Sequence, residues 1–102
     1  MILYNVTVQV EHSVVEDWLK WMREVHIPDV LKTKLFTGYK LCRLLNDEHS
    51  TYGVTYAVQY FLESSDDLDT YQKHYAPRLQ ADHYDRYGDK CLAFRTVLEV
   101  LE

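Results

Sequence analysis

The spacing of apolar residues changes along this chain, and the order of those changes restricts the folds that it can adopt. Apolar side chains recur at every second position in a strand and at every third or fourth position on one face of a helix. Alternating stretches span residues 2–10, 37–46, 52–62 and 90–101, and helical spacing spans residues 13–26 and 64–87. The sequence therefore predicts the order strand, helix, strand, strand, helix, strand.

The first helix carries the best candidate for chemistry, His26, at the end of its apolar face. Ser13 followed by Glu16 matches a capping box and marks the helix start. Pro28 cannot donate a backbone hydrogen bond and disfavours helical geometry at the preceding residue, so we expect the helix to break or bend near His26, with one short turn over residues 29–34. The apolar face comprises Val14, Val15, Trp18, Leu19, Trp21, Met22, Val25 and His26.

The second helical stretch has a marked start, interruption and end. Ser64 precedes acidic residues and predicts an N-cap. Pro77 lies inside the helical spacing and predicts a kink or two consecutive helices. Gly88 predicts the C-terminal stop. Asp82 and Arg86 are four positions apart, so we expect them to pair across one turn.

Two right-handed crossovers in this order give a ferredoxin-like βαββαβ fold, an antiparallel sheet of order 4-1-3-2 with both helices on one face. We expect one domain over residues 1–102. Cys42 and Cys91 then lie on opposite edge strands about 14 Å apart, too far for a disulfide. We expect both to be reduced core thiols.

The sheet face without helices is predicted to be half polar and half apolar. Such a face suits a wet cavity closed by a second copy, so we expect a homodimer that forms a dimeric α/β barrel through this open face. The residues assigned to it are Asn5, Thr7, Gln9, Thr55, Ala57 and Gln59 from the central strands, with Arg95 and Glu99 from the last strand.

Composition excludes several functions. A formal charge of −5 and a pI near 5.4 argue against nucleic-acid binding. No apolar stretch reaches eighteen residues, so we expect no membrane span. The first ten residues already alternate as a strand, so we expect no leader peptide and a cytoplasmic protein. Nine Tyr and two Trp are many aromatics for this length and favour a pocket or an interface.

The segments ILYNVTVQV, WLKWMREVHIPDVL, LFTGYKLCRLL, YGVTYAVQYF and AFRTVLEVL resemble a small bacterial family of single-domain proteins of unknown function. The whole chain is similar to the dimeric α/β-barrel superfamily, which includes antibiotic-biosynthesis-type monooxygenases, EthD-type proteins and muconolactone-isomerase-like enzymes. The resemblance implies a ferredoxin-like subunit, a face-to-face dimer and a ligand near the end of the first helix. It supplies no set of catalytic residues.

Each candidate site residue has a functional and a structural interpretation. His26 is either a general base or ligand-binding group, or a histidine that holds the corner at Pro28. Tyr39, Tyr56 and Tyr60 either orient a substrate or have a structural role in their strands. Arg43 and Arg95 either bind a carboxylate or form ion pairs at the surface or the dimer interface. Trp18 and Trp21 either line a cavity or pack in the core.

Two functions remain open. The first is a homodimeric module that binds a small hydrophobic ligand or has a structural role. The alternative is a cofactor-independent monooxygenase or isomerase acting on a small hydrophobic or aromatic substrate, with His26 as base or polarising group. We expect no metal site, because the other histidines lack metal-ligand spacing, and no cofactor; haem would require His26 or His83 to face a large cavity.

Overall fold

A computed structural model describes residues 1–46 and 51–102, so most of the turn expected at residues 46–50 lies outside the described residues. The sheet has the predicted ferredoxin-like topology, and every neighbouring pair is antiparallel. Its order is β2-β3-β1-β4, which is the expected 4-1-3-2 read from the other edge. The strands are β1 (Ile2–Glu11), β2 (Gly38–Arg43), β3 (Gly53–Leu62) and β4 (Cys91–Glu99).

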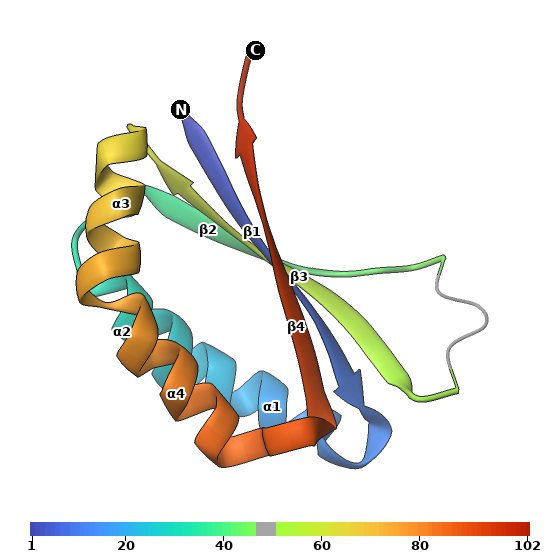
Figure 1. Ribbon diagram of the computed structural model, residues 1–102. Coiled ribbons are helices and arrows are strands. Elements are labelled where there is room, and N and C mark those ends of the chain that lie inside the picture. The colour runs from blue at the N-terminus through green and yellow to red at the C-terminus, as the bar shows by residue number, and fades with distance from the viewer. Residues whose placement is uncertain (47–50) are drawn as a thin grey trace.

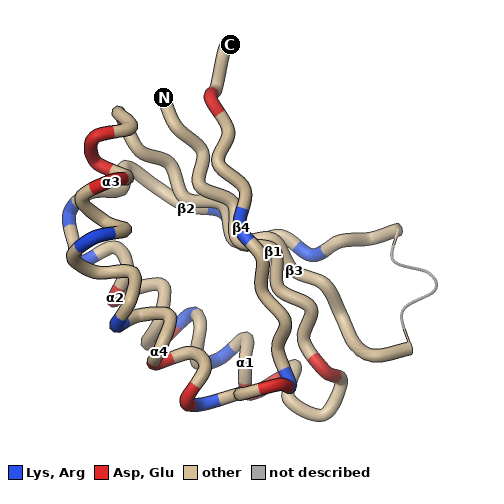
Figure 2. The backbone as a smooth tube through the Cα atoms, viewed as in Figure 1, with Lys and Arg blue, Asp and Glu red and all other residues tan. Residues whose placement is uncertain are grey.

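The helices cover one face of this sheet and leave the other uncovered (Figure 1). The first helical segment contains η1 (His12–Val14), α1 (Val15–Trp21), η2 (Met22–His26) and α2 (Ile27–Leu31). The second contains α3 (Ser65–His74), α4 (Ala76–Tyr87) and η3 (Gly88–Lys90). Charged residues gather on the helices, whereas β1 and β3 carry only Glu11 (Figure 2). Within residues 1–46 and 51–102, no helix is both long and apolar enough to cross a bilayer.

The helix does not break at Pro28, and the irregularity expected near His26 takes the form of a π-helical turn. His26 and Ile27 keep helical backbone angles, and Pro28 enters the first turn of α2. The reason is that η2 is a π-helix, whose wider turn relieves the clash between a proline ring and the carbonyl four residues earlier. The capping box is also wrong, because the Ser13 hydroxyl donates to Glu11 Oε1 at 3.0 Å and no side chain caps α1.

The π turn changes which residue reaches the core. After the buried Trp18 and Met22, the next buried residue is Ile27, five positions on, and not His26. Val30 then continues the buried face with α-helical spacing. His26 is therefore displaced from the apolar stripe to its edge, where its ring is half-buried.

The second helical segment follows the predictions at three points and departs from them at one. The Ser64 hydroxyl accepts from the Asp67 amide at 3.3 Å, Pro77 lies in the first turn of α4, and Gly88 ends α4 with a φ of 54°. The predicted pair of Arg86 with Asp82 is wrong, since Arg86 Nη2 instead lies 3.3 Å from Asp17 Oδ2 on α1.

The register of β4 corrects the predicted open face. Arg95 pairs with Val6 and Glu99 with Ile2, so both point to the helix side of the sheet. The open face carries the alternate residues instead, and three of them are apolar and exposed, namely Leu92, Phe94 and Leu98. Cys42 also lies on the open face and is exposed, so only Cys91 is a core thiol; neither forms a disulfide.

Candidate functional site

A narrow cavity of about 40 Å³ lies between the sheet and the helices, beside the β4 edge. This is room for about three water molecules. Every residue of β4 after Cys91 is exposed, so the helices do not cover this edge and the cavity opens there. The lining residues are Tyr4, Val6 and Val8 of β1, Met22 and His26 of η2, Val30 of α2, Val58 and Tyr60 of β3, Tyr71 of α3, Leu79, Gln80 and His83 of α4, and Ala93 and Arg95 of β4.

His26, the last residue of η2, lines this cavity. Its ring stacks on Trp21, with 5.0 Å between ring centroids and 29° between planes. Burial lowers the pKa of His26 to about 4, Asp29 and Asp82 oppose that shift, and the positive charge of Arg95 adds to it. His26 is therefore a neutral imidazole at pH 7, able to donate one hydrogen bond and accept another.

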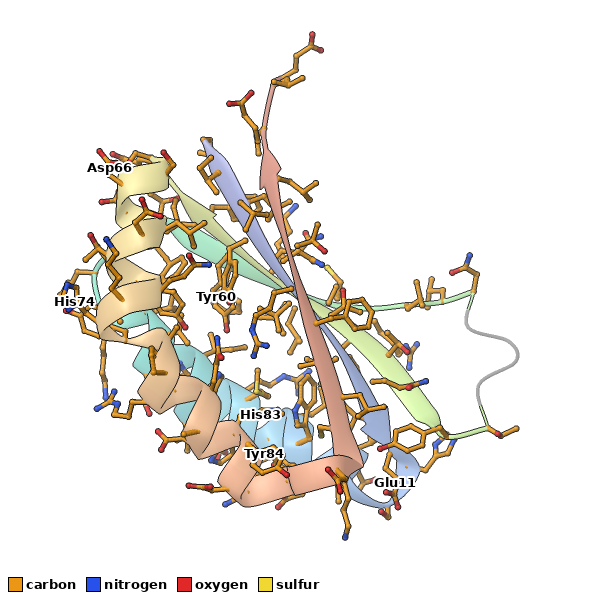
Figure 3. All side chains as sticks on the ribbon, in the orientation of Figure 1. Glu11, Tyr60, Asp66, His74, His83 and Tyr84 are labelled. Carbon is orange, nitrogen blue, oxygen red and sulfur yellow. The ribbon has the colours of Figure 1, made fainter. Side chains whose placement is uncertain are left out.

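His83, which the sequence analysis named only as a possible haem-facing histidine, is the second histidine of the cavity. It lies between α4 and the sheet (Figure 3), and its ring centroid is 5.9 Å from that of His26. Its Nε2 accepts a 2.9 Å hydrogen bond from Trp18 Nε1, which places the ring proton on Nδ1. Burial, His26 and Arg95 together lower its pKa to about 4. The available signal was spacing, because Leu79, His83 and Tyr87 are four apart on one helix face.

Arg95 and three phenols complete the polar part of the lining. The side chains of Arg95 and Gln80 both interact with the Tyr4 hydroxyl. Burial raises the pKa values of Tyr4, Tyr60 and Tyr71, so all three phenols remain protonated donors. No carboxylate among the described residues lies within 4 Å of an Arg95 nitrogen.

The structure separates the other predicted ligand-binding residues from this cavity. Trp18 is fully buried and stacks on Tyr56 with 5.0 Å between ring centroids, so it contacts the cavity only through its bond to His83. Tyr39 is 44% exposed. Arg43 lies on the opposite edge strand, in a shallow groove with Tyr56.

Trp21 supports the cavity from outside by stacking on His26, and it lies 5.8 Å from His83 between ring centroids. Of the eight residues predicted from the sequence, His26, Tyr60 and Arg95 therefore line the cavity directly. Among residues 1–46 and 51–102, no three His, Cys, Asp or Glu side chains are grouped to hold a metal ion.

The fold and the cavity define a ferredoxin-like α+β protein with a small pocket under its helices. The chain belongs to the family described as "Domain of unknown function (DUF4286)", whose family model matches residues 1–101. No curated protein matches the chain.

Several solved structures share the fold. An ethyl tert-butyl ether D family protein from Bacillus halodurans has a TM-score of 0.73 at 10% identity, over 99% of this chain and 100% of that one. A MhuD mutant with two manganese protoporphyrin IX molecules per active site has a TM-score of 0.72 at 17% identity, covering 100% and 96%. A dimeric ferredoxin-like protein from an uncultured marine organism has a TM-score of 0.64 at 14% identity, covering 99% and 98%. The TM-scores establish a shared fold, and at these low identities the likeness is one of fold alone.

Proposed function

We propose that this chain forms a homodimer that binds a small ligand in the cavity between the sheet and the helices. The observation that carries the proposal is the convergence of His26, His83 and Arg95, from three separate elements, on one mostly apolar cavity that opens at the β4 edge. A concave apolar site with a few converging polar groups is the usual form of a small-molecule site.

The charge state of the histidines favours binding over base catalysis. A general base works best when its pKa lies near the working pH. The pKa values of His26 and His83 are both about 4, because partial burial of each ring disfavours its charged form. Neutral imidazoles of this kind orient a ligand by hydrogen bonds, and they are weak proton acceptors at pH 7. The alternative of a monooxygenase or isomerase with His26 as base is therefore less well supported.

The dimer is supported by the open sheet face. Leu92, Phe94 and Leu98 of β4 are 51%, 62% and 45% exposed; the first two are neighbours on that face, and Leu98 follows beyond Thr96. Exposed apolar surface of this kind typically marks a protein interface. Among the structures that share the fold, several are described as dimeric ferredoxin-like proteins. A second copy that packs its own open face here would bury these side chains.

A cavity-filling variant tests the ligand site. Ala93 lines the cavity from β4 and is exposed, so Ala93→Phe places a ring at the cavity opening without removing a polar group. We expect a panel of small aromatic and aliphatic metabolites, screened by ligand-observed NMR, to yield hits that the variant no longer binds. Ala81→Phe on the exposed surface of α4, outside both the cavity and the open sheet face, is the matched control. Hits that bind both variants equally, or an absence of hits, would contradict a site in this cavity.

A further inference from the structure

Arg95 brings a positive charge into the cavity without a carboxylate partner in the lining. Among the described lining residues it alone is charged at neutral pH, because both histidines are neutral and the three phenols are protonated. The described lining includes no Asp or Glu; Asp29 and Asp82 act on His26 from outside the lining, and neither forms an ion pair with Arg95. A bound cation would be repelled there, whereas a single anionic group would find a charge-assisted partner.

The neighbours of Arg95 suit an oxygen anion. The Tyr4 hydroxyl interacts with the side chains of Arg95 and Gln80, and the positive charge of Arg95 also acts on the Tyr71 phenol. The groups facing Arg95 from the other elements are His26 of η2 and His83 of α4. Phenol and amide N–H or O–H groups donate to carboxylate oxygens, so these donors and the guanidinium satisfy an acceptor group better than a donor group.

The remaining lining limits the body of the ligand. Its other residues are aliphatic or sulfur-containing, namely Val6, Val8, Met22, Val30, Val58, Leu79 and Ala93. The cavity volume of about 40 Å³ admits only a narrow part of a ligand. The rest of the ligand would lie at the opening beside β4. One guanidinium also matches one negative charge, whereas a phosphate dianion calls for more cationic donors.

We propose that the ligand of this cavity is a small monocarboxylate with a thin apolar or aromatic body, whose carboxylate binds Arg95 and whose body lies among the valines and Leu79. This inference rests on the proposed ligand-binding function and adds the chemical class of the ligand. It also distinguishes the two arginines at the sheet edges, because Arg95 belongs to the site and Arg43 does not.

A matched pair of probes tests the charge requirement. 4-Fluorobenzoate and 4-fluorobenzamide have nearly the same shape and differ in charge, and ¹⁹F NMR titration of the full chain reports the Kd of each. We expect the benzoate to bind at least about tenfold more tightly, as a charge-assisted hydrogen bond predicts. Arg95→Met keeps the side-chain length and removes the charge, so the ratio of the two Kd values should fall to about two or less, with Arg95→Lys intermediate.

The control is the same substitution on the other edge strand. Arg43→Met should keep the wild-type ratio, because Arg43 is exposed and lies outside the cavity. Both arginines are exposed, so neither variant should unfold, and far-UV circular dichroism checks this. If both probes bind equally and Arg95→Met changes neither Kd, the anion inference fails while the ligand site stands. If neither probe binds while the metabolite panel still yields hits that Ala93→Phe abolishes, the monocarboxylate inference fails and the site stands. If neither the probes nor the panel bind, both are contradicted.

Discussion

The indole nitrogen of Trp18 donates a 2.9 Å hydrogen bond to Nε2 of His83, which joins α1 to α4 across 65 positions of sequence. Trp18 is fully buried, so its N–H has no access to water if this acceptor is lost. The bond also fixes the tautomer of His83 and leaves its Nδ1–H as the donor. One core contact thereby sets the hydrogen-bonding character of a cavity residue.

His83→Leu should destabilise the protein by about 1–3 kcal/mol, because it leaves the buried Trp18 N–H unsatisfied. The free energy of unfolding from urea denaturation measures this loss. His74→Leu on the exposed surface of α3 is the matched control and should change stability by less than about 0.5 kcal/mol. Equal effects in the two variants would contradict a structural role for the bond.

Stability should fall with acidification between pH 6.5 and about pH 4. The folded pKa values of His26 and His83 are about 4, below the ordinary value of 6.5, so the unfolded chain takes up protons first as the pH decreases. The contribution is therefore complete above pH 6.5, is lost progressively down to about pH 4, and changes no further below. Both rings are partly exposed and interact, so we expect about 2–4 kcal/mol for the pair.

Carboxylates titrate in part of the same range, so variants isolate the histidine contribution. His26→Gln should flatten the pH dependence of the unfolding free energy between pH 6.5 and 5, measured by urea denaturation at each pH. His74→Gln, on the exposed face of α3, should keep the wild-type slope. A slope unchanged by His26→Gln would show that His26 is not held neutral by burial.

The Tyr87 hydroxyl makes a second hydrogen bond between α4 and α1, in addition to the one between His83 and Trp18. It donates a 2.8 Å hydrogen bond to Asp17 Oδ2, which Arg86 also contacts, and Tyr87 is buried. Tyr87→Phe should therefore cost about 1 kcal/mol in unfolding free energy, measured by urea denaturation. Tyr84→Phe, three positions earlier and 62% exposed, is the matched control and should be neutral. If neither variant changed the unfolding free energy, the hydrogen bond between Tyr87 and Asp17 would make no net contribution to stability.

Self-association should depend on one face of β4. Phe94 and Val97 are both exposed on this strand, but Phe94 pairs with Thr7 on the open face and Val97 with Tyr4 on the helix side. Phe94→Glu should convert a dimer into a monomer in sedimentation equilibrium, because it buries a charge in the proposed interface. Val97→Glu should leave the dimer intact. Dissociation by Val97→Glu alone, or a monomeric wild type, would contradict the proposed interface.

The strand order was predictable because alternation in residues 2–10 and 52–62 is regular, and the crossover rule then left one simple topology. The parity of β4 was not predictable, because residues 91–98 are apolar at both parities and only the register with β1 assigns Arg95 to the helix side. The same ambiguity assigned Arg95 and Glu99 to the open face in place of Leu92, Phe94 and Leu98.

At the site, periodicity located His26 but assigned it to the wrong part of the helix surface. The prediction assumed α-helical spacing throughout, whereas η2 is a π-helix and moves Ile27 into the core position. His83 was considered only for metal spacing and as a possible haem-facing histidine, and neither interpretation predicts its hydrogen bond to Trp18. Its contact with Trp18 joins distant parts of the chain, and no local pattern encodes such a pairing.

The π turn also gives the helix a surplus residue whose removal is a defined structural change. Deleting Glu24 would let residues 22–26 close into an ordinary α-helix, in which the segments before and after it rotate by about 100° relative to their present alignment. Either Ile27 would then leave the core, or the His26 imidazole would leave the cavity between the helices and the sheet. A homologue one residue shorter here is thus expected to retain the scaffold while presenting a different side chain to whatever occupies the pocket.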